Sequence, residues 1–256
     1  MRRVLTLTMS VLLCGALLQA VDVWDAATED DGGTGTDNGA IHGTEQLHDL
    51  GANPGPTADQ DWYIFQNTAR SSYEVVIDGT TGDMNLTSGD VARMSDSVTV
   101  VQNSVQLQGY SAVLRFQNAT STTSTQWIRV SGASCTTACS SNDQYRFRFF
   151  ETTYSISRFN NSGTQVTVLN VASMVPFACS ATFHFYNTAG TFLGTATNSF
   201  SARELFVLNT SVSFPASSGS IIVSHTCGYG GLTGKAVAVE PATGFTFDTP
   251  LIPRIL

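Results

Sequence analysis

Short runs in which apolar and polar side chains alternate fill the chain from about residue 41 onward. The clearest is QYRFRF at 144–149, where Tyr145, Phe147 and Phe149 share one face of an extended strand and the two intervening arginines share the other. Similar runs occur at 61–65, 72–77, 111–116 and 126–130. Because no stretch sustains a helical apolar period over three turns, the pattern predicts an all-β fold of antiparallel sandwiches.

The runs form two series separated by a polar stretch at 158–163, RFNNSG. This break predicts two β-sandwich domains in tandem, of jelly-roll or immunoglobulin-like type, at 41–156 and 157–256. Within the second series, Asn187 to Gly190 lie between two apolar runs and predict a hairpin turn, because glycine adopts a positive φ readily. A single larger sandwich in which both halves share a sheet is the alternative.

The N-terminus has the features of an export signal. Arg2 and Arg3 precede an apolar run at 4–18, and the small residue Ala20 follows it. The run is shorter than the ~20 residues that a membrane-spanning helix needs, so we expect no transmembrane segment in the mature chain. These features predict a signal peptide at 1–20 and a protein that is extracellular, periplasmic or held at the cell surface.

Two points about this terminus stay open at the sequence level. Cys14 is a candidate lipid-attachment site, although Leu13 before it is larger than such sites prefer. The cleavage position is equally open, since Leu18 is larger than is usual three residues before a cut. The next segment, 21–40, is acidic and rich in glycine and lacks any strand or helix period, which predicts a flexible leader.

Few residues are charged, and those that are give a negative balance. Charged residues make up 12% of the chain, against about 25% in an average protein. The formal net charge is −8, and it becomes −10 once the two arginines of the signal are removed (10 basic minus 20 acidic residues). Such a balance repels phosphate backbones, so we expect no nucleic-acid partner.

Four motifs in the first series resemble a known family. They are DQDWYIF at 59–65, GDMNL at 82–86, QWIRV at 126–130 and QYRFRF at 144–149, and together they resemble the bacterial pre-peptidase C-terminal domain. The resemblance covers about residues 41–156. It implies a jelly-roll-like sandwich without catalysis, typically an appendage of secreted peptidases that binds or solubilises.

The same resemblance bears on metal binding and on the second half. GDMNL places oxygen ligands in an expected turn, which suggests a weak calcium site at Asp78, Asp83 and Asn85, although the family usually has a second aspartate where Asn85 stands. We expect no other cofactor. The second half, especially 234–251, resembles the C-terminal part of uncharacterised secreted bacterial proteins, which implies no particular activity.

Four cysteines remain once the signal is removed, an even number that favours disulfides in an exported protein. Cys179 shares strand parity with Phe183 and Phe185, and Cys227 shares it with Ile221 and Val223, so both sulfurs are expected in one core. We therefore predict the pairs Cys179–Cys227 and Cys135–Cys139. The second pair requires a tight turn, since four extended steps span about 13 Å against a limit of ~7 Å between bridged Cα atoms. Zinc is the rival reading, but the paired C-x-x-C spacing is missing.

No catalytic constellation is visible in the sequence. There is no G-x-S-x-G elbow, and nothing ties a serine to one of the four histidines, His42, His48, His184 and His225. His184 alternates with two phenylalanines, so we expect it on the outer face of its strand. We predict that the protein is not an enzyme.

The aromatic residues leave two readings open. Trp62, Tyr63 and Trp127 either fill cores or stack on sugar rings, and a regular strand would point one of Trp62 and Tyr63 outward. Together with the export signal, these features favour a secreted, non-catalytic protein that binds a surface or matrix polymer, either an extracellular polysaccharide or a protein. A structural envelope component and an unrecognised extracellular hydrolase are the alternatives.

Overall fold

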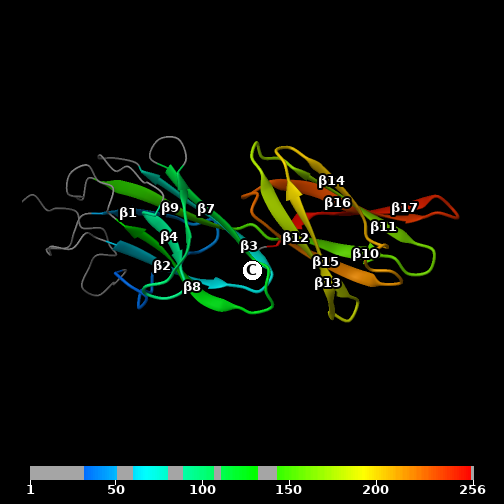
Figure 1. Ribbon diagram of the computed structural model, residues 1–256, viewed down its shortest axis with the longest axis horizontal. Coiled ribbons are helices and arrows are strands. Elements are labelled where there is room, and N and C mark those ends of the chain that lie inside the picture. The colour runs from blue at the N-terminus through cyan, green and yellow to red at the C-terminus, as the bar shows by residue number, and fades with distance from the viewer. Residues whose placement is uncertain (1–31, 51–59, 80–88, 107–110, 132–142, 255–256) are drawn as a thin grey trace, which may run out of the picture.

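The computed structural model of the protein describes residues 32–50, 60–79, 89–106, 111–131 and 143–254. Throughout these ranges the fold is all-β, with four antiparallel sheets and no helix, as the alternating sequence predicts. Figure 1 shows two bodies side by side, the first built from strands β1 to β9 and the second from β10 onward. We call them the first and the second unit.

The first unit contains two sheets that enclose one core. One sheet has the order β1 (Glu45–Asp49), β9 (Gln144–Glu151), β3 (Ser71–Gly79), β7 (Ser111–Asn118) and β6 (Val105–Gln106). The other has the order β2 (Gln60–Asn67), β8 (Ser124–Ser131), β4 (Val91–Met94) and β5 (Val100–Asn103). Tyr145, Phe147 and Phe149 of β9 all lie in this core, which confirms the alternation expected of that strand.

The second unit is built in the same way. Its first sheet has the order β13 (Phe192–Phe200), β12 (Cys179–Asn187), β15 (Ser218–His225), β10 (Tyr154–Asn160) and β18 (Ile252–Pro253). Its second sheet has the order β14 (Leu205–Asn209), β11 (Val166–Ser173), β16 (Leu232–Glu240) and β17 (Phe245–Pro250). The expected turn at 187–190 joins β12 to β13, and the side chain of Asn187 accepts hydrogen bonds from the backbone of Ala189 and Thr191.

The change from one core to the other differs from the expected break at 158–163. The first core ends at Phe149 and the second begins at Tyr154, so only a few residues separate them. Phe159, in the middle of the polar-looking stretch, is fully buried in the second core. A β-bulge between Ile156 and Phe159 shifts the register of β10, and this lets a single aromatic ring point inward among polar neighbours.

The last part of the expected leader is also ordered against the first unit. The backbone of Asn38 and that of Ala40 both bond to Ile64 of β2, at 2.9 Å each. The side chain of Asn38 is fully buried, and Ala40 packs on the core. The alternation of apolar and polar residues does not predict that this segment is ordered, because two backbone hydrogen bonds hold it in place and no apolar face does.

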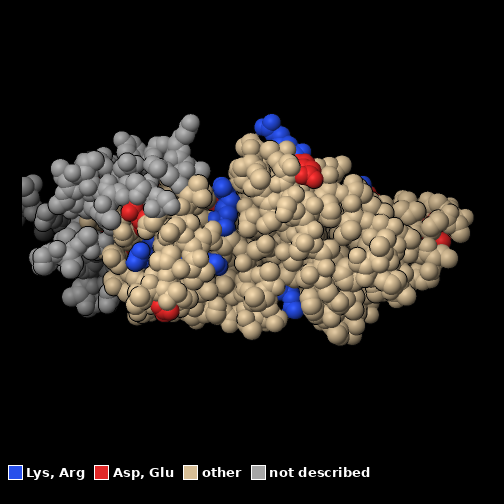
Figure 2. Space-filling model, in the orientation of Figure 1, with Lys and Arg blue, Asp and Glu red and all other residues tan. Residues whose placement is uncertain are grey.

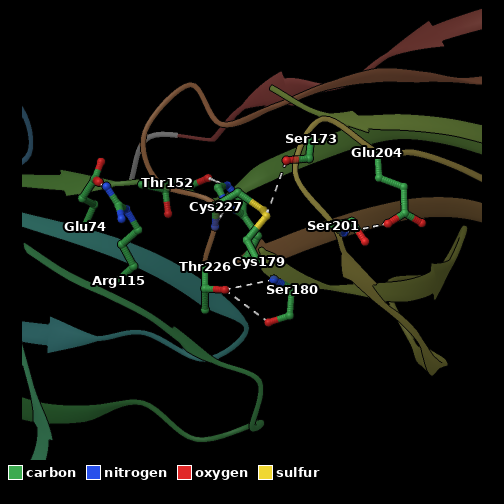
Figure 3. The surroundings of a disulfide bond; sticks show 11 residues. Glu74, Arg115, Thr152, Ser173, Cys179, Ser180, Ser201, Glu204, Thr226 and Cys227 are labelled. Carbon is green, nitrogen blue, oxygen red and sulfur yellow. Dashed lines mark hydrogen bonds and ion pairs between the residues drawn. A yellow bond between two sulfur atoms is a disulfide. The ribbon is translucent and has the colours of Figure 1, made fainter. Parts of the chain in front are cut away.

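The disulfide between Cys179 and Cys227 confirms the predicted pair. The two Cα atoms are 5.0 Å apart, and both sulfurs lie in the second core. Figure 3 shows the bond beside Ser173 and near the Ser180–Thr226 pair. Cys135 and Cys139 lie outside the described residues.

Candidate binding site

The predicted calcium ligands are only partly visible. Asp78 lies one residue before the end of β3, where it forms a close ion pair with Arg148 and accepts a hydrogen bond of 2.6 Å from Ser111. Both of its carboxylate oxygens thus already have partners in the protein. Asp83 and Asn85 lie outside the described residues, and no metal-binding group of His, Cys, Asp or Glu is found in the part of the chain that is described. Calcium binding stays a prediction.

The aromatic side chains considered for sugar stacking are packed rather than displayed. Tyr63 lies in the first core, where its ring stacks on that of Phe147 at 3.7 Å between centroids. Trp62 points to the opposite face of β2, as parity requires, yet it is 3% exposed and packs with Met94 and Trp127. Trp62 and Tyr63 therefore offer no flat ring to a ligand.

His184 lies on the outer face of β12, as its alternation with two phenylalanines predicts. The first unit covers that face and leaves the side chain fully buried. Its Nε2 donates to the hydroxyl of Ser224 at 3.0 Å, and Ser224 in turn donates to the side chain of Gln117 in the first unit at 2.9 Å. Burial, with a smaller effect of nearby arginines, lowers the pKa of His184 to about 4.

A second group of hydrogen bonds holds the two units together where the chain passes between them. Thr152 and Thr153, the only residues between β9 and β10, are both buried. Ser72 of β3 donates its backbone N–H to the hydroxyl of Thr153 and accepts a hydrogen bond from that of Thr152, both at 2.9 Å. A two-residue connection with these bonds leaves little room for the units to move against each other.

The carboxylate of Glu74 adds a charged contact to this junction. It accepts from Arg115 Nε at 2.6 Å within the first unit and from the backbone N–H of Tyr229 in the second unit at 2.7 Å. The guanidinium of Arg115 also lies 4.5 Å from the ring of Phe177, across the junction. Figure 3 shows the Glu74–Arg115 pair close to the disulfide. These contacts join the two units directly at the junction.

The junction should make stability sensitive to acid through His225. Its Nδ1 accepts from Cys227 N at 3.1 Å and its Nε2 donates to Thr152 O at 2.6 Å, an arrangement that fits only the neutral ring. Burial lowers its pKa to about 4, whereas an unfolded histidine titrates near 6.5. Between about pH 6.5 and pH 4, His225 is protonated in the unfolded chain but stays neutral in the folded chain. The free energy of unfolding therefore decreases as the pH falls through this range. We expect the Tm to fall over this range and His225→Gln to reduce the fall; an unchanged fall in the variant would contradict this role.

A groove of about 540 Å³ lies on the surface of the second unit. It lies across the ends of β10, β12 and β15, and backbone and side chains of ten residues line it: Ser157, Arg158, Phe159, Asn160, Asn187, Thr188, Gly190, Ser218, Gly219 and Ser220. Most of the side chains are hydroxyls and amides, with one guanidinium and no carboxylate or imidazole. Such a lining can hydrogen-bond a polyol but offers no general acid or base.

The floor of the groove depends on Gly219. This residue pairs with Asn187 of β12, and a Cβ atom placed on it would lie 1.9 Å from Tyr186 O. The side chains on both sides of it, those of Ser218 and Ser220, are small and leave the groove open along this part of β15. The run SGS at 218–220, in an otherwise strand-like pattern, is a sequence signal for the groove that strand periodicity alone does not reveal.

Charged side chains are sparse on the face of the molecule that Figure 2 shows. Figure 2 shows a face on which Lys, Arg, Asp and Glu are scattered among uncharged residues.

Among the described residues no helix is long and apolar enough to cross a membrane.

Comparison with known proteins gives no family. No family model matches the chain, and no curated protein matches it. Solved structures with weak likeness include a beta-glucuronidase of Bacteroides uniformis (14% identity, 74% of this chain and 26% of that chain, TM-score 0.22). A glycosyl hydrolase family 2 member of Bacteroides cellulosilyticus DSM 14838 is another (11% identity, 80% of this chain and 31% of that chain, TM-score 0.24). The chain thus spans less than a third of either protein, and likeness at this level assigns no activity.

Proposed function

We propose that this chain is an exported, non-catalytic protein that binds a polysaccharide in the groove of the second unit. The observation that carries the proposal is the lining of that groove, in which hydroxyl and amide side chains surround an open space of about 540 Å³. Sugar rings are recognised by hydrogen bonds of this kind, and an open groove accepts the middle of a long chain.

Two further features support binding without turnover. The hydrolysis of a glycosidic bond needs two carboxylates on either side of it, and the groove lining contains none. Arg158, the one charged residue there, lies with its guanidinium 5.3 Å from the ring of Phe247 on β17. This contact holds its side chain beside the groove, where its N–H groups can donate to sugar oxygens.

Export is part of the proposal. The segment 1–20 has the order of a signal peptide, and the Cys179–Cys227 disulfide suits an oxidising compartment. The likeness of residues 41–156 to the pre-peptidase C-terminal domain points to the same setting, because that family consists of secreted appendages. A ligand at the cell surface or in a matrix is therefore the natural partner.

A co-sedimentation assay tests the proposal. The mature chain is mixed with insoluble cellulose, chitin and xylan and with polygalacturonate immobilised on beads. The bound fraction is compared with that of Ser220→Trp, which fills the groove, and of Thr233→Trp, which adds the same ring to the exposed face of β16. We expect the wild type and Thr233→Trp to bind at least one polymer and Ser220→Trp to bind about tenfold less, because the groove is blocked. Failure to bind any polymer, or sugar release that a single Asp or Glu substitution abolishes, would contradict the proposal.

A further inference from the structure

A second, smaller pocket of about 260 Å³ opens at one end of the first core. It lies between the two sheets of the first unit and is lined by Asn67, Arg93, Gln117, Asn118, Ala119, Thr120, Thr122, Ser124 and Gln126. We call it the Arg93 pocket. The chain has 20 acidic residues, yet none of them lines it. Its only charge is therefore positive.

Arg93 has an aromatic neighbour but no acidic one among the described residues. Its guanidinium lies 4.4 Å from the ring of Phe116 in the first core, and no carboxylate among the described residues forms an ion pair with it. Burial lowers its pKa to about 10, which still leaves it charged at neutral pH. Arg93 is partly buried, and a partly buried charge without a counter-charge carries a desolvation cost that a cation–π contact offsets only in part.

The neighbouring amides are also incompletely satisfied. Arg93 Nε, Gln126 Oε1 and Asn67 Oδ1 are buried atoms with no hydrogen-bond partner. Each such atom costs free energy in the ligand-free protein. These three atoms leave one donor on Arg93 and two amide acceptors beside the pocket without a partner in the protein.

The chemistry of the lining selects the ligand class. The planar guanidinium of arginine donates two parallel hydrogen bonds to a carboxylate. Around it the amides of Gln117 and Gln126 and the hydroxyl of Ser124 suit the hydroxyls of a sugar ring. Both requirements are met by a sugar acid.

The Arg93 pocket and the groove also lie near each other. Gln117, in the pocket lining, accepts the hydrogen bond of Ser224 on β15. Ser220, four residues earlier on the same face of β15, lines the groove. Four residues of strand span about 13 Å, which is the separation of the two places along β15.

We propose that the Arg93 pocket binds the carboxylate of a uronic-acid residue, and that the polysaccharide recognised by this protein is an acidic one. The proposal rests on the proposed function, since it places a carboxylate subsite beside the polysaccharide groove. Arg93 would supply the charge, and the amides around it would position the ring.

The test is a titration of the mature chain with soluble polygalacturonate, with dextran as a neutral polymer and polyglutamate as a carboxylate polymer without sugars. Arg93→Met removes the charge but keeps a flexible side chain over Phe116, and Ser124→Trp blocks the exposed rim of the pocket. Arg146→Met is the matched control, because it removes an equally positive side chain from an exposed ion pair with Glu45 on the same unit.

We expect polygalacturonate to bind more tightly than dextran or polyglutamate. Arg93→Met and Ser124→Trp should each weaken it by about tenfold or more, and Arg146→Met by less than about twofold, because charge-assisted hydrogen bonds are strong and exposed pairs are weak. The Tm of ligand-free Arg93→Met should equal or exceed that of the wild type, since an uncompensated charge is lost; a purely structural arginine would give a lower Tm.

Three results would overturn the inference. They are equal binding by Arg93→Met and the wild type, equal losses in Arg93→Met and Arg146→Met, and polyglutamate binding as tight as polygalacturonate, which would indicate an acidic peptide instead. If neutral polymers bind and Ser220→Trp abolishes that binding while polygalacturonate shows no preference, only the carboxylate subsite fails. If free galacturonate binds in an Arg93-dependent way but no polymer does, the polysaccharide function fails and the subsite stands.

Discussion

Replacing Cys179 and Cys227 together by Ala is expected to lower the free energy of unfolding by about 4 kcal/mol in the chain-entropy model, because the bond closes a long loop in the unfolded chain. The two residues are 48 positions apart, and both are buried in the second core. Thermal and urea unfolding of the oxidised wild type and the double variant measure the difference.

The matched comparison is the pair Cys135→Ala and Cys139→Ala. If those two residues are bridged as the sequence predicts, their loop is short and its removal should cost about 2 kcal/mol in the same model. Equal losses in the two double variants, or no loss for Cys179 and Cys227, would contradict the assignment of the longer loop as the main covalent support of the second unit.

A fragment of residues 152–256 is expected to fold on its own, whereas one of residues 164–256 is expected to stay unfolded. The shorter fragment lacks β10, which lies between β15 and β18 and contributes Tyr154, Ile156 and Phe159 to the second core. The loss of three buried side chains removes roughly 5 kcal/mol or more of apolar burial. Since small domains have only about 5–15 kcal/mol of stability in total, this loss is enough to unfold the unit.

Circular dichroism and thermal melting of both fragments provide the measurement. Phe159→Ala in the full chain serves as an intermediate case, expected to cost about 3–5 kcal/mol through the cavity that it leaves. A cooperative melt of the 164–256 fragment, or none for the 152–256 fragment, would show that the second unit does not depend on β10 in the way that its sheet order indicates.

The two-residue period of a strand is enough to predict which side chains face the core. Strict alternation in β9 predicted its buried face correctly, since inward and outward side chains have different polarity. Parity likewise placed Cys179 and Cys227 in the same core. These predictions need only the two-residue period of a strand.

Strand period alone does not predict burial on the face of a strand that points away from the sandwich core. His184 and Trp62 both point away from the sandwich cores, as their parity requires, and both are nevertheless buried. The first unit covers His184, whereas Trp62 packs with Met94 and Trp127. Strand parity gives the direction of a side chain but not what lies on that side, and for this reason the candidate binding residues were also missed.

Chemical-shift mapping by NMR is the measurement that tests polysaccharide binding in the groove most directly. The labelled mature chain is titrated with a soluble fragment of the polymer that it retains. The account predicts that the shifted amides gather at 157–160, 187–190 and 218–220, which line the groove. Shifts confined to the far sheet of β14, β11, β16 and β17, or no shifts at saturating ligand, would contradict it.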